Sequence, residues 1–344
     1  MKQITTVGID LAKSVFQIHA VDGRGRVVLR KQLQRKQVAA FFANLPPCLI
    51  AIEACGSSHY WARTLSEYGH SVKLMPPQYV KPYVKTNKHD AADAEAISEA
   101  VSRPNMRFVA VKTPEQQSLL ALHRAREGFI KARTAQTNQI RGLLSEFGLV
   151  IPKGIGAIAR ALPECLEDAE NGLPGTFRAL LARLGAHLRE LTRQVRELEG
   201  EIQQWHRHNA ASLRLEKVPG IGPLTASALV ASVGDVSHFK NARQLAAWLG
   251  LVPRQHATGG KPLLLGISKH GDGYVRKLLI HGARSVVRVS AHKAQPDPWL
   301  EGLLRRRHKN VPAVALANKN ARIAWALLAH DRDYEPSYAP RLAH

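Results

Sequence analysis

The stretch Val7–Phe16 (VGIDLAKSVF) constrains the fold most, because it places a carboxylate inside an apolar run. Residues 4–9 are rich in β-branched side chains, which is typical of a buried strand. Asp10 follows directly, and Leu11 and Val15 continue the apolar pattern beyond it. Burial of an isolated carboxylate is costly unless it is paired, hydrogen-bonded or bound to a metal ion. Taken alone, Asp10 is better explained as an Asp that closes a strand with a local turn hydrogen bond.

Up to about Val111 the pattern alternates between strands and helices, which predicts an α/β domain over residues 1–112. Asp22-Gly23 and Gly25 supply turn chemistry, so the first three strands are expected to form an antiparallel meander. Asp90 is the expected N-cap of the last helix. The expected strands are residues 5–10, 16–21, 26–32, 48–53 and 72–75, and the expected helices are residues 37–44, 58–68 and 90–102.

Three later carboxylates change the interpretation of Asp10. Glu53 closes a second apolar strand (CLIAIE), which could lie beside the strand that ends at Asp10. Asp90 and Asp93 are three residues apart, so on a helix they share a face and repel each other unless a cation lies between them. The competing interpretation of this pair is an N-cap and a solvated acid that the helix dipole stabilises. Four acids together favour a site for Mg²⁺ or Mn²⁺, and two such ions can promote phosphodiester chemistry.

The charge balance indicates a polyanionic partner. The chain of 344 residues has 49 basic and 27 acidic residues, a formal net charge of +22, which favours nucleic acid first and a membrane surface second. No apolar run is long enough to span a bilayer, and residues 1–10 lack the pattern of a secretory signal. Three cysteines without a CxxC pair argue against a zinc site or a disulfide scaffold and for a reducing, cytoplasmic environment.

Residues 113–214 are expected to form a helical, coiled-coil region. Thr113-Pro114 is a good helix start, and the helix expected over residues 113–148 has a basic polar side that suits a phosphate backbone or is simply solvated. Residues 152–175 are interpreted as a Gly/Pro-punctuated connection. Apolar residues then recur in steps of four and three, which is coiled-coil spacing, and the partner is either the preceding helix or another protomer. The members of this seam are Phe177, Leu181, Leu184, Leu188, Leu191, Val195, Leu198, Ile202 and Trp205.

Residues 215–330 are expected to form a mostly α-helical domain with two nucleic-acid-binding features, followed by a loose tail over residues 331–344. The stretch 217–235 contains a Pro-Gly-Ile-Gly-Pro turn typical of a helix-hairpin-helix, where the amides of Gly220 and Gly222 could hold a phosphate. A plain helix–turn–helix packing unit is the alternative. The stretch 250–288 combines glycines with cations, which suits a phosphate-binding site or a flexible basic loop. The expected nucleic-acid contacts are Arg254, Lys261, Lys269, Arg276, Lys277, Arg305, Arg306 and Arg307.

Three motifs together resemble the RuvC-like, RNase H-fold domain of the DEDD insertion-sequence transposases (insertion-sequence family 110, 1111-like subgroup). They are VGIDLAKSVF, AIEACGSSHYWA and KTNKHDAADAEAI. The stretch 250–288 resembles the C-terminal transposase domain of that subgroup, which has a GGK–GISK–GD–R pattern. The resemblance implies that Asp10, Glu53, Asp90 and Asp93 are the metal-binding and catalytic tetrad.

The same resemblance implies an RNA-guided DNA recombinase, also called a bridge recombinase. Its members act on donor and target double-stranded DNA with a non-coding guide RNA and Mg²⁺ or Mn²⁺, expected here as two ions. They assemble as dimers to tetramers in the bacterial cytoplasm, at the nucleoid. A loop serine before the first glycines is their nucleophile, and this chain has Ala257 at that position, followed by Thr258. Either Thr258 serves, or the alignment slips by one residue, or the chain is an inactive natural copy or carries an engineered substitution.

Two other classes of function fit part of the sequence. A Holliday-junction-type, structure-selective endonuclease would share the acidic tetrad and the helix-hairpin-helix but needs no guide RNA and no Gly-rich nucleophile loop, so residues 250–288 argue against it. A non-enzymatic nucleic-acid-binding protein could keep the acids as relics. Titration with Mg²⁺ separates this last class, because a relic site need not bind metal.

Overall fold

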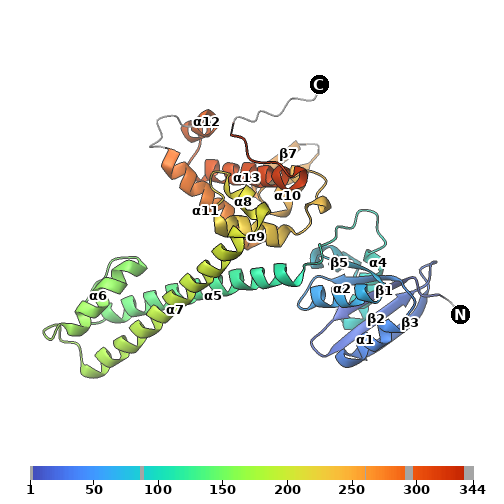
Figure 1. Cartoon of the computed structure of the whole chain (residues 1–344), viewed down its shortest axis with the longest axis horizontal. Coiled ribbons are helices and arrows are strands. Elements are labelled where there is room, and N and C mark those ends of the chain that lie inside the picture. Colours follow the sequence, from blue (N-terminus) through green and yellow to red (C-terminus); the bar gives the residue numbers. More distant parts are fainter. Residues whose placement is uncertain (1–2, 86–88, 260, 291–296, 337–344) are drawn as a thin grey trace. The chain divides into compact units, whose positions relative to one another are not determined.

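The protein divides into two compact units, Met1–Pro114 and Glu115–His344. The structure is a computed structural model that describes residues 3–85, 89–259, 261–290 and 297–336 (Figure 1). The division falls close to the expected boundary at residue 112. The finer boundaries at residues 214 and 330 stay predictions, and part of the expected tail lies outside the described residues.

A five-stranded mixed sheet forms the centre of the N-terminal unit, with the strand order β3-β2-β1-β4-β5. The first three strands pair antiparallel, which confirms the expected meander, and β4 and β5 continue the sheet in parallel with β1. The strand that ends at Glu53 therefore does lie beside the strand that contains Asp10. The strands are β1 (Thr6–Leu11), β2 (Val15–Val21), β3 (Val27–Gln34), β4 (Leu49–Glu53) and β5 (Ser71–Met75).

Helices cover both faces of this sheet, as the alternation of side chains along a strand requires. Val7 and Ile9 of β1 share an apolar core with α1 (Arg35–Ala43) and α2 (Ser58–Glu67). The opposite face carries α4 (Asp90–Ala100), whose apolar residues pack with Ala51 of β4 and Met75 of β5. Two short turns connect β5 to this helix, α3 (Pro77–Val80) and η1 (Lys81–Tyr83).

The C-terminal unit begins with an antiparallel pair of long helices, α5 (Pro114–Ser145) and α7 (Gly175–Arg207). Three side-chain contacts fix their direction. Trp205 Nε1 donates to a carboxylate oxygen of Glu115 at 2.7 Å, Arg126 pairs with Glu199 at 2.5 Å, and a ring nitrogen of His187 lies 2.8 Å from Gln136 Oε1. The order of these contacts runs in opposite directions along the two helices. An apolar cluster at the far end joins Ile140 and Leu144 of α5 to Leu181 and Leu188 of α7, so this part of the expected seam has its partner in the same chain.

The expected connection over residues 152–175 was wrong for part of its length, because it contains the helix α6 (Ile155–Glu167). Gly156 and Pro163 argued against a helix there. The helix forms nevertheless because Ile158 and Leu162 are buried in the cluster between α5 and α7, and tertiary burial outweighs weak local propensity. Gly185 of α7 leaves room for this contact, since a Cβ there would lie 2.7 Å from Leu162 Cδ2.

The remainder of the C-terminal unit is mostly helical, as expected. Buried residues of α8, α9, α10, α11 and α13 share one apolar core. The elements are α8 (Ala210–Glu216), α9 (Pro223–Val233), η2 (Val236–His238), α10 (Ala242–Trp248), β6 (Pro253–Thr258), β7 (Lys261–Ile267), α11 (Gly273–Ser290), α12 (Pro298–Arg306) and α13 (Asn310–His330). None of the helices in the described parts of the chain is both long and apolar enough to cross a membrane.

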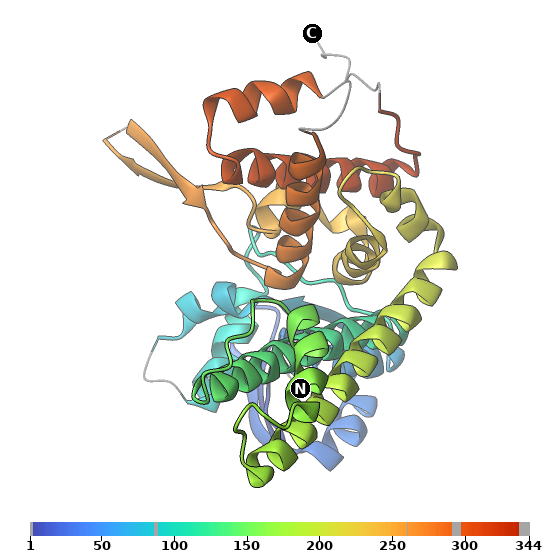
Figure 2. The same ribbon diagram turned by 90° about the vertical axis from the view of Figure 1, so that its left-hand side faces the viewer.

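The stretch 250–288 is not a flexible loop, which was one of its two interpretations, but a β-hairpin followed by a helix. β6 and β7 pair antiparallel and extend away from the helices of their unit as a two-stranded ribbon (Figure 2). Two glycines allow backbone segments to pack closely at the base of this ribbon. A Cβ on Gly250 would lie 2.4 Å from the carbonyl oxygen of His270, and a Cβ on Gly271 would lie 1.8 Å from the carbonyl oxygen of Trp248. Glycine at these positions is therefore required by the close approach of two backbone segments.

Candidate functional site

Three of the four predicted acids meet in the N-terminal unit. Asp10, Asp90 and Asp93 each offer a carboxylate oxygen, and these oxygens all lie within 4.8 Å of one another. Asp10 and Asp93 are half-buried and Asp90 is exposed. Oxygen-only ligands at this separation suit a hard cation such as Mg²⁺ or Mn²⁺. The donor set therefore fits the expected metal.

Gly8 is the residue that lets these acids meet, and sequence reasoning missed its role. It lies two residues before Asp10 on the same face of β1, directly beneath α4. A Cβ on Gly8 would lie 2.3 Å from the carbonyl oxygen of Ala94 and 2.6 Å from the amide nitrogen of Ser98. Only glycine lets the helix come this close to the strand. The signal was present in the sequence, because a glycine inside an apolar strand often marks a close backbone approach.

The first turn of α4 supplies Asp90 and Asp93. The expected N-cap was wrong by one residue: His89 is the cap, and its Nδ1 accepts a hydrogen bond from the amide of Ala92 at 3.2 Å. Asp90 is thereby released from capping and starts the helix itself. The partial positive charge of the helix N-terminus stabilises both carboxylates, which offsets part of their mutual repulsion.

Glu53 lies at the same edge of the sheet but outside this group of three. Ile52 of β4 pairs with Ile9 of β1, so the next residues along the two parallel strands are Glu53 and Asp10. The pKa of the Cys55 thiol is raised to about 11, first by desolvation and then by the negative charges of Glu53 and Asp10. Both carboxylates therefore act on one neighbouring group, and this edge of the sheet collects negative charge.

The predicted nucleophile position lies at the tip of the β6–β7 hairpin. Ala257 pairs with Pro262 and Thr258 pairs with Lys261, so the two strands pair up to the end of β6 and the start of β7. Gly259 has φ +56°, which favours glycine, and Gly260 lies outside the described residues. Ala257 and Thr258 are both exposed and, as strand neighbours, point to opposite faces. Thr258 Oγ1 lies 3.4 Å from His256 Nδ1 on its own face.

Three of the predicted nucleic-acid contacts have structural partners that account for their residue type. Arg276 donates from one guanidinium nitrogen to the carbonyl oxygens of Leu249 and His270, at 3.0 and 2.7 Å. Lys277 pairs with Glu127 of α5. Gly220 has φ +90° and lies against the backbone of Gly282 in α11. Gly222, by contrast, is exposed and directly precedes α9.

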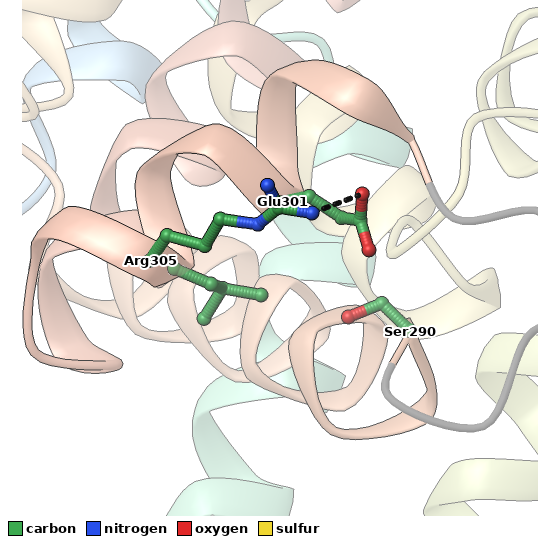
Figure 3. A pocket seen from close by; sticks show the side chains of 4 residues that line it. Ser290, Glu301 and Arg305 are labelled. Atoms are coloured by element: carbon green, nitrogen blue, oxygen red, sulfur yellow. Dashed lines mark ion pairs between the residues drawn. The ribbon is translucent and has the colours of Figure 1, made fainter.

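The other predicted contacts are exposed on two surfaces of the C-terminal unit. Arg254 and Lys261 project from the hairpin, and Lys269 at its base has φ +57°, an uncommon conformation for a residue with a side chain. Arg305, Arg306 and Arg307 lie at the end of α12. Arg305 is 3.7 Å from Glu301 and lines a hollow with Ser290 and Leu304 (Figure 3).

Comparison with known proteins relates nearly the whole chain to insertion-sequence transposases. A family profile described as "Transposase IS116/IS110/IS902 family" matches residues 212–296, and one for DEDD-type IS110 transposases matches residues 7–148. A Pseudomonas aeruginosa protein named "Probable family 20 transposase" is 55% identical over 335 residues, 97% of this chain and 99% of that protein. The transposases named for insertion sequence elements IS1328 of Yersinia enterocolitica and IS1111A of Coxiella burnetii are 44% and 43% identical, over 95% and 97% of this chain and 97% and 92% of their own.

Proposed function

The chain belongs to the IS110/IS116/IS902 family of insertion-sequence transposases, and we propose that it cleaves and exchanges DNA strands at the carboxylate cluster of its N-terminal unit. Its family implies a DNA-cleaving enzyme with an RNase H-like domain. The observation that carries the proposal is the meeting of Asp10, Asp90 and Asp93, which come from a strand and a helix far apart in the sequence.

Asp10, Asp90 and Asp93 would hold Mg²⁺ or Mn²⁺, and Glu53 would complete the site from the neighbouring strand. When bound, two such ions can generate a nucleophile and stabilise the leaving oxygen of a phosphodiester. The chain itself supplies the geometry. The sheet fixes Asp10 and Glu53, while α4 presents its two acids from one turn. Clustered carboxylates alone would repel the DNA phosphate, so a cation is required to bring substrate and site together.

Thr258 is the nearest hydroxyl to the position where this family carries a nucleophilic serine. It would attack the scissile phosphorus while a deoxyribose hydroxyl leaves, which forms a protein–DNA phosphodiester. Two features weigh against efficient attack: its branched Cβ restricts the side-chain rotamers, and it faces the opposite side of β6 from Ala257. We therefore expect the chain to bind DNA but to form little covalent adduct.

Guide RNA and oligomerisation complete the proposal. The net charge of +22 supports binding of both a non-coding guide RNA and two DNA duplexes. The α7 seam and α5 would form a coiled coil that also joins copies of the chain into dimers or tetramers. The turn before α9 would hold a backbone phosphate as a helix-hairpin-helix, chiefly through the exposed Gly222. This set of partners would place the protein at the nucleoid.

The assembly has a direct test. Leu191 is buried and Leu198 is half-buried on α7, so Leu191→Asp with Leu198→Asp places two charges in the seam at a cost of several kcal/mol, roughly 2–7 for each buried polar group. The variant is expected to lose its higher oligomer or to unfold. A folded variant of unchanged mass by light scattering would refute the seam. Sequencing of RNA that co-elutes with the protein tests the guide.

The chemistry is tested by two sets of variants. In the Ala257→Ser background, Asp10→Asn and Asp93→Asn are expected to abolish strand transfer and to leave DNA binding largely intact; full activity in either would refute the assignment. Ala257→Ser is expected to restore the covalent adduct in Mg²⁺, and a further Asp10→Asn to remove it again. If the unaltered chain already forms the adduct and Thr258→Val abolishes it, Thr258 is the nucleophile.

A further inference from the structure

We propose that His19 and Ser98 are positioning residues that fix α4 on the sheet and thereby set the metal affinity of the carboxylate cluster. The proposal rests on the metal role of that cluster. It concerns two residues that are not ligands themselves and that no motif singled out. Their contribution acts through the placement of the helix, because α4 carries two of the three clustered acids.

His19 lies on β2 directly opposite Gly8 of β1. Its side chain is almost fully enclosed, with 4% of its surface exposed. One ring nitrogen, Nδ1, lies 2.8 Å from Ser98 Oγ in the last part of α4. Ser98 is also one of the residues that a Cβ on Gly8 would strike. The closest approach of helix to strand and the buried polar contact between them therefore occur at the same place.

The contact joins three polar groups. Ser98 Oγ also donates to the carbonyl oxygen of Glu95 at 2.9 Å, and which partner donates in the His19–Ser98 hydrogen bond depends on the tautomer of the ring. The other ring nitrogen, Nε2, has no hydrogen-bond partner among the described residues and lies 3.9 Å from a carboxylate oxygen of Glu95. Desolvation lowers the pKa of His19, which favours the neutral ring. A buried, directional hydrogen bond is sensitive to small shifts of either partner.

A second contact supports the same turn of the helix from the next strand. Glu95 of α4 accepts a hydrogen bond from Arg30 of β3 at 3.2 Å, and Arg30 pairs with His19 across the β2–β3 ladder. Three adjacent strands thus hold the segment Ala94–Ser98. Asp90 and Asp93 precede this segment on the same helix. A helix advances about 1.5 Å and turns about 100° per residue, so a small slip at Ser98 moves both carboxylates relative to Asp10.

Apolar packing alone does not fix the position of α4 along the sheet. Ala96, Ile97 and Ala100 also bury α4 against the sheet, but such contacts are non-directional and tolerate small displacements. The His19–Ser98 hydrogen bond adds the directional part. Its loss should therefore weaken metal binding more than it weakens folding.

His70 provides a matched control in the same unit. It is also 4% exposed and is held through both ring nitrogens. The amide of Cys48 donates to Nδ1 at 3.2 Å, and Nε2 lies 3.0 Å from the carbonyl oxygen of Phe42. These partners belong to α1 and to the residue before β4, so its contacts lie away from α4. A substitution at His70 reports the general cost of removing a buried histidine.

The test is a titration of the full-length protein with Mn²⁺, followed by calorimetry, alongside thermal unfolding of each variant. His19→Leu and Ser98→Ala are expected to raise the Mn²⁺ dissociation constant about tenfold, as is common when residues that orient metal ligands are removed. His19→Asn is expected to recover most of the affinity, because its side-chain amide can replace Nδ1 as the hydrogen-bond partner of Ser98. His70→Leu is expected to lower thermal stability and to leave Mn²⁺ affinity unchanged.

Unchanged Mn²⁺ affinity in folded His19→Leu or Ser98→Ala would overturn the proposal, and so would an equal loss of affinity in His70→Leu. If His19→Leu does not fold, Ser98→Ala decides, because it removes a single oxygen atom. Failure of the metal assignment has a different signature: the unaltered chain and Asp93→Asn would then give the same isotherm.

Discussion

The carboxylate cluster and the β6–β7 hairpin are built in opposite ways. The acids of the cluster are positioned by buried contacts, namely the glycine that admits α4 and the polar contact between His19 and Ser98. The hairpin has exposed residues along the whole of β6, and Leu263 and Leu264 of β7 are 60% and 66% exposed. The first region is preorganised by its own fold, while the second offers cations, apolar side chains and a hydroxyl to whatever binds there.

This difference indicates where sequence changes should matter. In the cluster, a change to a residue that touches no ligand should disturb the chemistry, because the ligands depend on packing. In the hairpin, a change should act on binding alone, since little else depends on those side chains. Substitutions beneath α4 should therefore have larger effects than substitutions along the ribbon.

The same substitution in the two regions should give very different results. Gly8→Ala places a Cβ 2.3 Å from the backbone of α4, whereas nothing lies within 4 Å of a Cβ on Gly266 in β7. Overpacking against backbone is expected to cost about 3 kcal/mol and to displace the helix, so Gly8→Ala should unfold readily and lose Mn²⁺ binding. Gly266→Ala should keep the unfolding midpoint. Denaturant unfolding measures both, and equal midpoints would show that the two regions do not differ in this way.

The interior of the C-terminal unit can be compared with both regions, because it also contains a buried histidine, His123, which is 1% exposed. His123 of α5 contacts Tyr274 Oη at 2.9 Å and Ser227 Oγ at 3.1 Å, and desolvation with the charge of Arg126 lowers its pKa to about 4. The unfolded chain takes up this proton near pH 6.5 and the folded chain only near pH 4, so stability falls as the pH drops through this range. The decrease in the free energy of unfolding is about 3 kcal/mol.

His123→Gln should flatten this acid-dependent decrease in stability. Unfolding free energies at several pH values between neutrality and the folded-state pKa of His123 measure it. An unchanged pH profile would show that His123 is protonated in the folded protein.

The cations of the hairpin should affect DNA affinity without affecting stability. Arg254→Ala and Lys261→Ala are each expected to reduce the slope of log affinity against log salt by about 0.9 for each phosphate that the variant no longer neutralises. The free energy of unfolding should change by no more than about 0.5 kcal/mol. Lys277→Ala is the matched comparison, because Lys277 already pairs with Glu127. We expect a smaller change of slope for Lys277→Ala than for Arg254→Ala. A larger change for Lys277→Ala would contradict a role of the hairpin in binding phosphates.

The periodicity of apolar residues and the residue types were enough to predict most of the sheet and the three acids that cluster. The strands ending near Asp10 and Glu53 follow from β-branched apolar runs, and the shared helix face of Asp90 and Asp93 follows from their spacing. What could not be predicted depends on contacts between distant segments. The helix α6 forms because of burial that its glycine and proline content conceals.

Glycines and cations were ambiguous for the same reason. The glycine of a phosphate-binding turn and the glycine of a tight packing contact look alike in a sequence, and Gly220 packs against Gly282. The guanidinium of Arg276 similarly donates to two backbone carbonyls, which no local pattern predicts. The role of Gly8 depends on a helix that begins about eighty residues later.

Whether the carboxylate cluster, and not the hairpin, binds the catalytic cation is tested most directly by replacing Mg²⁺ with Fe²⁺. With ascorbate and peroxide, bound Fe²⁺ generates radicals that cut the nearby backbone, and mass spectrometry locates the cuts. We predict cuts near Asp10, Glu53 and Asp90–Asp93 that disappear in Asp93→Asn and in excess Mg²⁺. Cuts concentrated in residues 253–267, or an identical pattern in Asp93→Asn, would contradict a metal site at the cluster.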